Sequence, residues 1–280
     1  MDRACRWRSL ALLAVGTACG ESRSSGEANG RIADVSVTPG VGQTTAVPRA
    51  IAVRSLARAA GGPDGRTYTV SALASHGFIV GKIGGAAPRD TSIAPTHDLA
   101  VCRPFTESVV PSRDGGVGNS VVWLVGVESG PADDAPRRVR VMLDGCRLDP
   151  RVQRVAAGGT VMLTSRDNMM TRLQFVDVGG VSASRGTVLF SDAGQVVPTS
   201  DAAQMPGLVQ IRDDLHPWIR AYLAVTPHPF VAVTAADGRF RFDNVPPGSY
   251  TLVTWHERLG TKQQRVRVEA HIETRVDLKF

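Results

Sequence analysis

The chain has 280 residues, of which 42% are hydrophobic and 21% are charged, so it is long enough to bury at least one sizeable core. Its formal net charge is +6, but three of its arginines lie within the first eight residues and the others are scattered. Because no basic cluster is interleaved with aromatic residues, the charge argues against nucleic-acid binding and supports only weak attraction to anionic surfaces.

The first 19 residues have the pattern of a bacterial export signal. Arginines precede the apolar run Leu10–Val15, and small residues then lead to Cys19. The apolar run is too short to span a bilayer. Val15–Gly20 resembles a lipobox, in which the cysteine is lipidated, although Gly16 stands where Leu is usual. We predict a signal peptide over residues 1–19 and a lipid anchor on Cys19; ordinary secretory cleavage with Cys19 incidental is the alternative.

Cysteine usage agrees with export. Cys5 leaves with the signal and Cys19 carries the lipid, so Cys102 and Cys146 remain. An oxidising compartment would allow these two to pair, and we predict a disulfide between them. Two free buried thiols are the alternative, because pairing depends on a geometry that the sequence does not show.

Residues 20–66 are rich in Gly, Ser, Ala and Thr and contain few large apolar side chains. This composition predicts a flexible tether, and about 45 such residues have a root-mean-square reach of roughly 35–40 Å. Ala50–Ala60 is a weak candidate for a short helix inside it. The tether would hold a folded domain clear of a lipid surface.

Beyond Arg66, short apolar or alternating runs are separated by Gly, Pro, Asp and Asn, and no stretch keeps a helical period. The pattern predicts an all-β sandwich or barrel. Two turn signals stand out near the C-terminus: Asp237-Gly238, which predicts a hairpin, and Pro246-Pro247-Gly248. We expect one β-domain over residues 67–225 and a β-module over residues 226–280, and Phe240, Phe242, Tyr250 and Leu252 are its predicted core.

A family resemblance rests on Cys146, on Pro150–Val152, on Gly158–Asn168, on Leu208–Ile219 and above all on the stretch from His216 to Glu257. These segments resemble exported bacterial cupredoxin-like proteins with a carboxypeptidase-regulatory-like C-terminal part. The resemblance covers most of the chain from Tyr68 onward. It implies a cupredoxin-like Greek-key sandwich followed by a regulatory-like, transthyretin-like β-module.

The same resemblance implies that the copper ligands are degenerate. His216, Pro217 and Trp218 are retained, but Asp213 stands where the family has Cys and Ile219 stands where it has Met. Near Thr171 the expected His is missing, and Arg151 occupies a position where His is frequent. A blue-copper centre needs a thiolate, two imidazoles and a weak axial ligand. We therefore expect no copper electron-transfer site, and we interpret Met169 and Met170 as core filler.

A different metal site is the sharper alternative. Asp213, Asp214 and His216 with His228 or His256 could hold zinc or copper(II), since carboxylate and imidazole suit both ions. The competing interpretation is that Asp213 and Asp214 cap a turn, that His216 packs against its neighbours, and that the other histidines are satisfied loop residues. No compact ligand spacing is present, so we expect no metal.

Catalytic patterns are missing from the sequence. His256-Glu257 has no partnered nucleophile, and no phosphate-binding Gly-rich loop opens a helix. Trp123, Trp218 and Trp255 would suit stacking on sugars, but tryptophans in apolar strands are usually core residues.

These observations predict a non-catalytic lipoprotein of the bacterial cell envelope, in the periplasm or at the outer membrane. Its expected contacts are the membrane surface through the lipid anchor and an envelope protein or glycan, and we expect no nucleic acid. Two alternatives stay open: a copper- or zinc-binding or electron-transfer protein that uses His216, and a carbohydrate-binding envelope protein.

Overall fold

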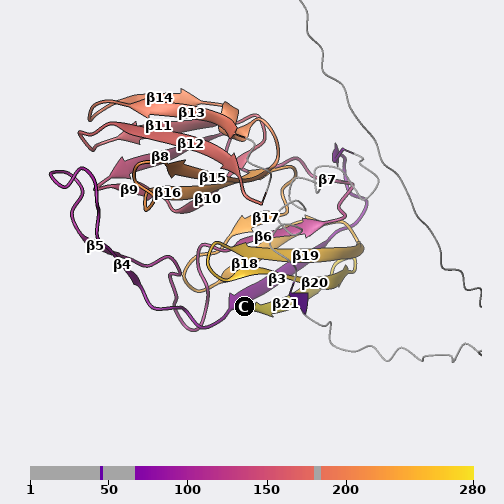
Figure 1. Ribbon diagram of the computed structural model, residues 1–280. Helices are drawn as coiled ribbons and strands as arrows, with labels where there is room; N and C mark the ends of the chain where they lie inside the picture. Colours follow the sequence, from indigo (N-terminus) through magenta and orange to yellow (C-terminus); the bar gives the residue numbers. More distant parts are fainter. Residues whose placement is uncertain (1–44, 47–66, 180–183) are drawn as a thin grey trace, which may run out of the picture. The chain divides into compact units, whose positions relative to one another are not determined.

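The computed structural model describes residues 45–46, 67–179 and 184–280 (Figure 1). The predicted signal peptide, Cys19, nearly all of the predicted tether and the candidate helix Ala50–Ala60 lie outside these residues. The described part is all-β, with one short 3₁₀ turn, η1 (Asp201–Ala203). The described residues form one compact unit. In the described part, no helix has the length and apolar character needed to cross a bilayer.

Nine strands form a first sandwich of two sheets. The five-stranded sheet has the order β10 (Val152–Ala156), β16 (Arg220–Thr226), β15 (Gly207–Asp213), β12 (Thr171–Asp177) and β13 (Ser184–Phe190). The four-stranded sheet has the order β14 (Val196–Thr199), β11 (Thr160–Ser165), β8 (Arg138–Asp144) and β9 (Arg147–Asp149). The β10–β16 and β8–β11 pairs are parallel, and the other pairs in these sheets are antiparallel. The sheets therefore join strands that are distant in sequence.

The remaining strands form a second sandwich and two small ribbons. One sheet has the order β1 (Thr45–Ala46), β20 (Gly260–Val268), β19 (Gly248–His256), β6 (Val121–Val125) and β17 (Val231–Val233). The other has the order β18 (Arg239–Val245), β3 (Gly77–Gly84) and β21 (Glu273–Lys279). The ribbons are β2 (Thr69–Val70) with β7 (Ser129–Gly130), and β4 (Thr91–Ile93) with β5 (Phe105–Glu107).

This pairing divides the chain differently from the expected ranges 67–225 and 226–280. The early strands β3 and β6 pair with the late strands β18, β19 and β21. The first sandwich is accordingly inserted between parts of the second one, and a boundary at residue 225 does not separate them. The reason is that β3 and β6 supply central strands, without which the C-terminal strands would form incomplete sheets.

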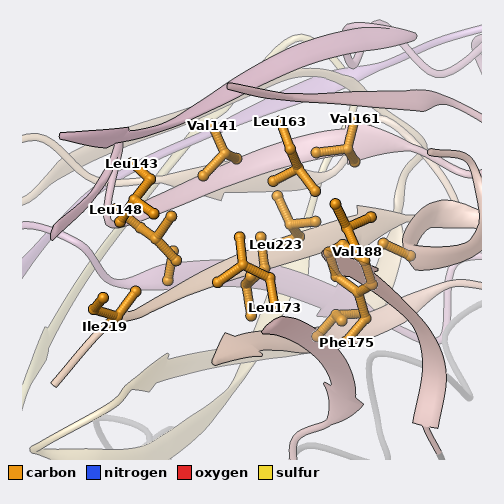
Figure 2. Packing of buried hydrophobic residues seen from close by; sticks show 14 of the residues in the cluster. Val141, Leu143, Leu148, Val161, Leu163, Leu173, Phe175, Val188, Ile219 and Leu223 are labelled. Atoms are coloured by element: carbon orange, nitrogen blue, oxygen red, sulfur yellow. The ribbon is translucent and has the colours of Figure 1, made fainter. Parts of the chain in front are cut away.

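The core of the first sandwich follows from strict alternation along its strands. In β8, Val139, Val141 and Leu143 are buried, while the residues between them face outward. Figure 2 shows Val141 and Leu143 on one sheet, with Leu173 and Leu223 opposite them on the facing sheet. Each side chain that leaves water in this way contributes about 1.5–3 kcal/mol.

Three strands, β6, β16 and β19, are buried on both faces. In β6, Val122 and Leu124 enter the core of the second sandwich, while Val121 and Trp123 enter a third apolar cluster. This third cluster combines side chains of both sandwiches: Val121, Trp123, Val152, Leu208, Tyr222, Ala224, Val231, Val253 and Trp255. Tyr222 and Trp255 contact there with ring centroids 5.0 Å apart. A continuous apolar seam therefore joins the two sandwiches.

The turn at Asp237-Gly238 is present, but it does not form the expected hairpin. The strand before it, β17, pairs with β6, whereas the strand after it, β18, pairs with β3 in the other sheet. Gly238 has a φ of +71°, and a Cβ there would lie 2.1 Å from the carbonyl oxygen of Ile83. The turn is thus pressed against β3, and the chain crosses between sheets at this point.

We predict that Trp123→Ala lowers the free energy of unfolding of the full chain by about 3–5 kcal/mol, because Trp123 is fully buried in the seam. Ile272→Ala, at a side chain that is 51% exposed, should change it by less than about 0.5 kcal/mol. Urea denaturation of both variants provides the measurement. Equal effects of the two substitutions would contradict the buried seam.

Candidate functional site

The segment from Asp213 to Ile219 connects β15 to β16 at one end of the first sandwich. Asp213 is buried, and its carboxylate accepts three backbone hydrogen bonds. Oδ1 accepts from the N–H groups of Leu215 at 2.7 Å and His216 at 3.2 Å, and Oδ2 accepts from the N–H group of Arg172 at 3.0 Å. Asp213 therefore holds the turn closed and ties it to the start of β12.

The imidazole of His216 is fully buried between two carboxylates. Its Nε2 lies 2.8 Å from Oδ2 of Asp98, and since an ionised carboxylate only accepts, Nε2 carries the proton in this bond. Its Nδ1 lies 3.4 Å from Oδ1 of Asp213, an ion-pair distance without hydrogen-bond geometry. Both ring nitrogens face carboxylates, and the ring edge also meets Trp218 with centroids 5.4 Å apart.

Asp98 reaches His216 from a loop that a disulfide holds in place. The backbone N–H groups of Val101 and Cys102 donate to the carbonyl of Asp98, and Cys102 is bonded to Cys146. The structure thus pairs the two cysteines that the cysteine count indicated. Both sulfur atoms are buried and lie 3.6 and 3.8 Å from the thioether sulfur of Met169. His216 and the disulfide therefore anchor the same loop to the sandwich.

The other residues that the copper pattern drew attention to lie in the core, point to solvent or pair with β12. Ile219 and Thr171 are completely buried, and Met169 belongs to the core, whereas Met170 is exposed. Asp214 does not cap the turn as expected: its carboxylate pairs with Arg172 and accepts from Gln174 Nε2 at 2.8 Å. Side-chain donors on β12, rather than backbone N–H groups, satisfy this aspartate.

The residues present do not fit a copper centre. There is no thiolate in the segment, the Asp213 oxygens already accept three N–H groups, and Ile219 has no donor atom. Among residues 67–179 and 184–280, no group of three or more His, Cys, Asp or Glu side chains is placed to hold a metal ion. The structure therefore supplies a hydrogen-bonded network at this end of the sandwich and not a ligand set.

His228 and His256, the two other candidate ligands, satisfy backbone groups elsewhere. The Nδ1 atom of His228 accepts from the N–H group of Phe230, and Nε2 lies 3.2 Å from the carbonyl oxygen of Leu124. His256 makes the same pair of contacts, with the N–H group of Arg258 and the carbonyl oxygen of Val109. Both are buried neutral rings that secure neighbouring chain segments, and neither contacts His216.

Burial controls the protonation of both rings. It lowers the pKa of His228 to about 4 and also lowers the pKa of His256, because the imidazolium form would lose its hydration. Burial likewise raises the pKa of Tyr68, whose ring contacts His228, to about 12. These shifts accompany structural hydrogen bonds, with Tyr68 donating to the carbonyl of Pro131.

Arg151 lies in a buried ion cluster that the sequence did not reveal. Its guanidinium makes a bidentate pair with Glu257 at 2.7 Å and a further bond to Glu107 at 2.6 Å. Arg220 lies 3.7 Å from Glu257. Burial alone would lower the pKa of Arg151, but the hydrogen bond and charge of Glu257, with the charge of Glu107, raise it. The position that carries His in the family pattern thus holds a cation between two carboxylates.

Cupredoxins are among the solved structures to which part of the chain is similar, and the similarity is distant. Amicyanin from Paracoccus versutus is 22% identical over 33% of this chain and 81% of its own, with a TM-score of 0.27. A purple cupredoxin from Nitrosopumilus maritimus is 16% identical over 31% of this chain and 99% of its own, with a TM-score of 0.26. No protein-family model and no curated protein matches the sequence. The chain is therefore an all-β protein with distant structural similarity to cupredoxins over about a third of its length.

The pKa of His228 predicts a pH-dependent stability. Between about pH 6.5 and about pH 4 the unfolded chain binds a proton at this residue and the folded chain does not. The free energy of unfolding therefore falls as the pH falls through this window, by roughly 3 kcal/mol in total. His256, whose pKa is also lowered, acts in the same direction.

Urea denaturation from pH 7.5 to pH 4 measures this effect. His228→Gln cannot be protonated, so its stability should fall less steeply with decreasing pH than that of the unsubstituted chain. The exposed residue His271 provides the control, and His271→Gln should keep the original slope. Identical slopes for all three proteins would rule out the neutral, buried His228.

Proposed function

We propose that the protein is a non-catalytic β-sandwich protein of the bacterial cell envelope. In this proposal it is exported and held at the membrane by a lipid on Cys19, and it serves in binding or as a structural module. Its first sandwich derives from a cupredoxin that lost its copper site. Its C-terminal strands are of the carboxypeptidase-regulatory-like kind.

One observation supports the proposal: in the copper-like segment, the Asp213 carboxylate and Nε2 of His216 are engaged in structural hydrogen bonds. His216 has one ring nitrogen bonded to Asp98 and the other facing Asp213, and the Asp213 carboxylate is occupied by backbone donors. A metal ion at Nε2 would have to displace Asp98, and one at Nδ1 would meet an Asp213 carboxylate that already accepts three N–H groups. Breaking the hydrogen bonds of the buried Asp213 would leave polar atoms without partners, which costs about 1–3 kcal/mol per group.

Neither copper electron transfer nor stacking of sugars on tryptophan gains a comparable observation. Electron transfer through copper would need a thiolate and a second imidazole, and the segment offers neither. Sugar stacking would need an exposed aromatic platform, but the exposed fractions of Trp123, Trp218 and Trp255 are 0%, 7% and 0%. These three residues serve the cores of the sandwiches and the seam.

Metal binding to the full chain tests the proposal. After incubation with copper(II) or zinc and dialysis, we expect well below one equivalent of either metal by elemental analysis. His216→Ala should leave this value unchanged but lower the free energy of unfolding by about 2–4 kcal/mol, because it removes a buried ring and its bond to Asp98.

The matched control for this experiment is His271→Ala, which removes an exposed imidazole. Uptake of one equivalent of metal that is lost in His216→Ala and kept in His271→Ala would contradict the proposal. Such a result would establish the metal-binding alternative instead.

A further inference from the structure

The outer face of the β18–β3–β21 sheet contains an open depression of about 520 Å³. The inward side chains of these strands, among them Ile79, Ile83, Phe240 and Leu278, build the core of the second sandwich. The outward side chains are not needed for that core. The chemistry of these outward side chains therefore indicates which kind of ligand the face can bind.

Strand register arranges these outward residues in two rows. Val80 of β3 lies between Arg241 of β18 and Arg275 of β21, because both pair directly with it. Two residues along β3, Lys82 lies in the same way between Arg239 and Asp277. Directly opposed Cβ atoms are about 4.5–5.5 Å apart, so four cationic side chains lie around Val80, and two carboxylates, those of Glu273 and Asp277, also line the depression.

The arginines of this face make few close contacts that stabilise the fold. The side chains of Arg239 and Arg275 are 79% and 76% exposed, and their nearest carboxylate contacts are 3.9 and 3.5 Å long. Exposed pairs of this length contribute little to stability. Arg241 is half exposed and pairs with Asp243 at 2.6 Å, while its guanidinium also lies over the ring of Phe78. Guanidinium groups thus border the depression from both outer strands.

We propose that this depression binds the oxyanion groups of an extended anionic polysaccharide. Arginines match phosphate, sulfate or carboxylate groups with paired N–H donors. The two rows along the strands suit charges repeated along a polymer. The proposal names a ligand class for the binding role proposed above, and it concerns a different sandwich from the one that holds His216.

The shape of the face favours a polymer over a membrane surface. The charged groups line a depression whose volume is within the range of ligand pockets, together with Val80, Gly81 and Phe240. A chain of linked sugars can lie in such a depression and reach its cationic groups. A planar layer of lipid headgroups would contact the edge of the depression first.

Binding of the full chain to dextran sulfate at about 150 mM salt tests the proposal, with uncharged dextran as the negative probe. Arg239→Gln, Arg241→Gln and Arg275→Gln together should raise the Kd for dextran sulfate at least about tenfold. The matched control replaces Arg137, Arg138 and Arg140 by Gln. These three exposed residues lie on or next to β8, and their replacement removes the same net charge.

The control variant should change the Kd by less than about threefold, since only long-range attraction is altered. Equal weakening by the two triple variants, or no binding by the unsubstituted chain, would overturn the proposal. Vesicles that contain phosphatidylglycerol are the second probe. If the triple substitution of Arg239, Arg241 and Arg275 weakens vesicle binding more than dextran sulfate binding, the face binds lipid and the proposal is wrong.

Thermal unfolding of both triple variants checks that they are folded. Failure here leaves the metal experiment above unaffected, so the two proposals can fail separately.

Discussion

Burial of β6, β16 and β19 on both faces is the constraint on which the rest of the structure depends. Along β16, Ala221, Leu223 and Val225 enter the core of the first sandwich, while Tyr222 and Ala224 enter the seam. Such a strand cannot expose either face without leaving apolar surface in water, at about 25 cal/mol per Å². The seam therefore couples the two sandwiches, and each one covers a face that the other would otherwise leave open.

The ion cluster around Arg151 lies beside this seam and has a different role. Arg151 precedes β10 in the first sandwich, while Glu257 follows β19 in the second. Buried ion pairs often contribute little net stability, because desolvation offsets their attraction, but a missing partner is costly. We infer that the bidentate pair fixes how the two sandwiches meet, while the apolar seam supplies the stabilisation. At the same end of the first sandwich, where β10 and β16 begin, Asp98, His216 and Asp213 fix a loop in the same manner.

The sequence predicted the type of structure well because strand alternation and turn residues are local signals. Strands such as β8 and β19 agree with the apolar runs expected there. The sequence did not predict β3, since Gly77, Gly81 and Gly84 interrupt its apolar pattern, although Gly81 is needed where Phe240 packs against the strand. The boundary between sandwiches also could not be predicted, because it depends on pairing between strands more than 100 residues apart.

At the candidate site, too, local features can be predicted from the sequence and long-range contacts cannot. That Asp213 and Ile219 carry neither a thiolate nor a thioether can be seen directly in the sequence. The partner of His216 could not be seen, because Asp98 lies 118 residues away and carries no motif. The sequence singles out Arg151 only because the resemblance leads one to expect His there. Its partners Glu107 and Glu257 can be identified only from the fold.

Calorimetric unfolding of the full chain tests most directly whether the two sandwiches form one unit. A continuous seam predicts a single transition from the folded β-region, with a calorimetric enthalpy equal to the van't Hoff enthalpy. Two resolved transitions, one for each sandwich, would contradict the account.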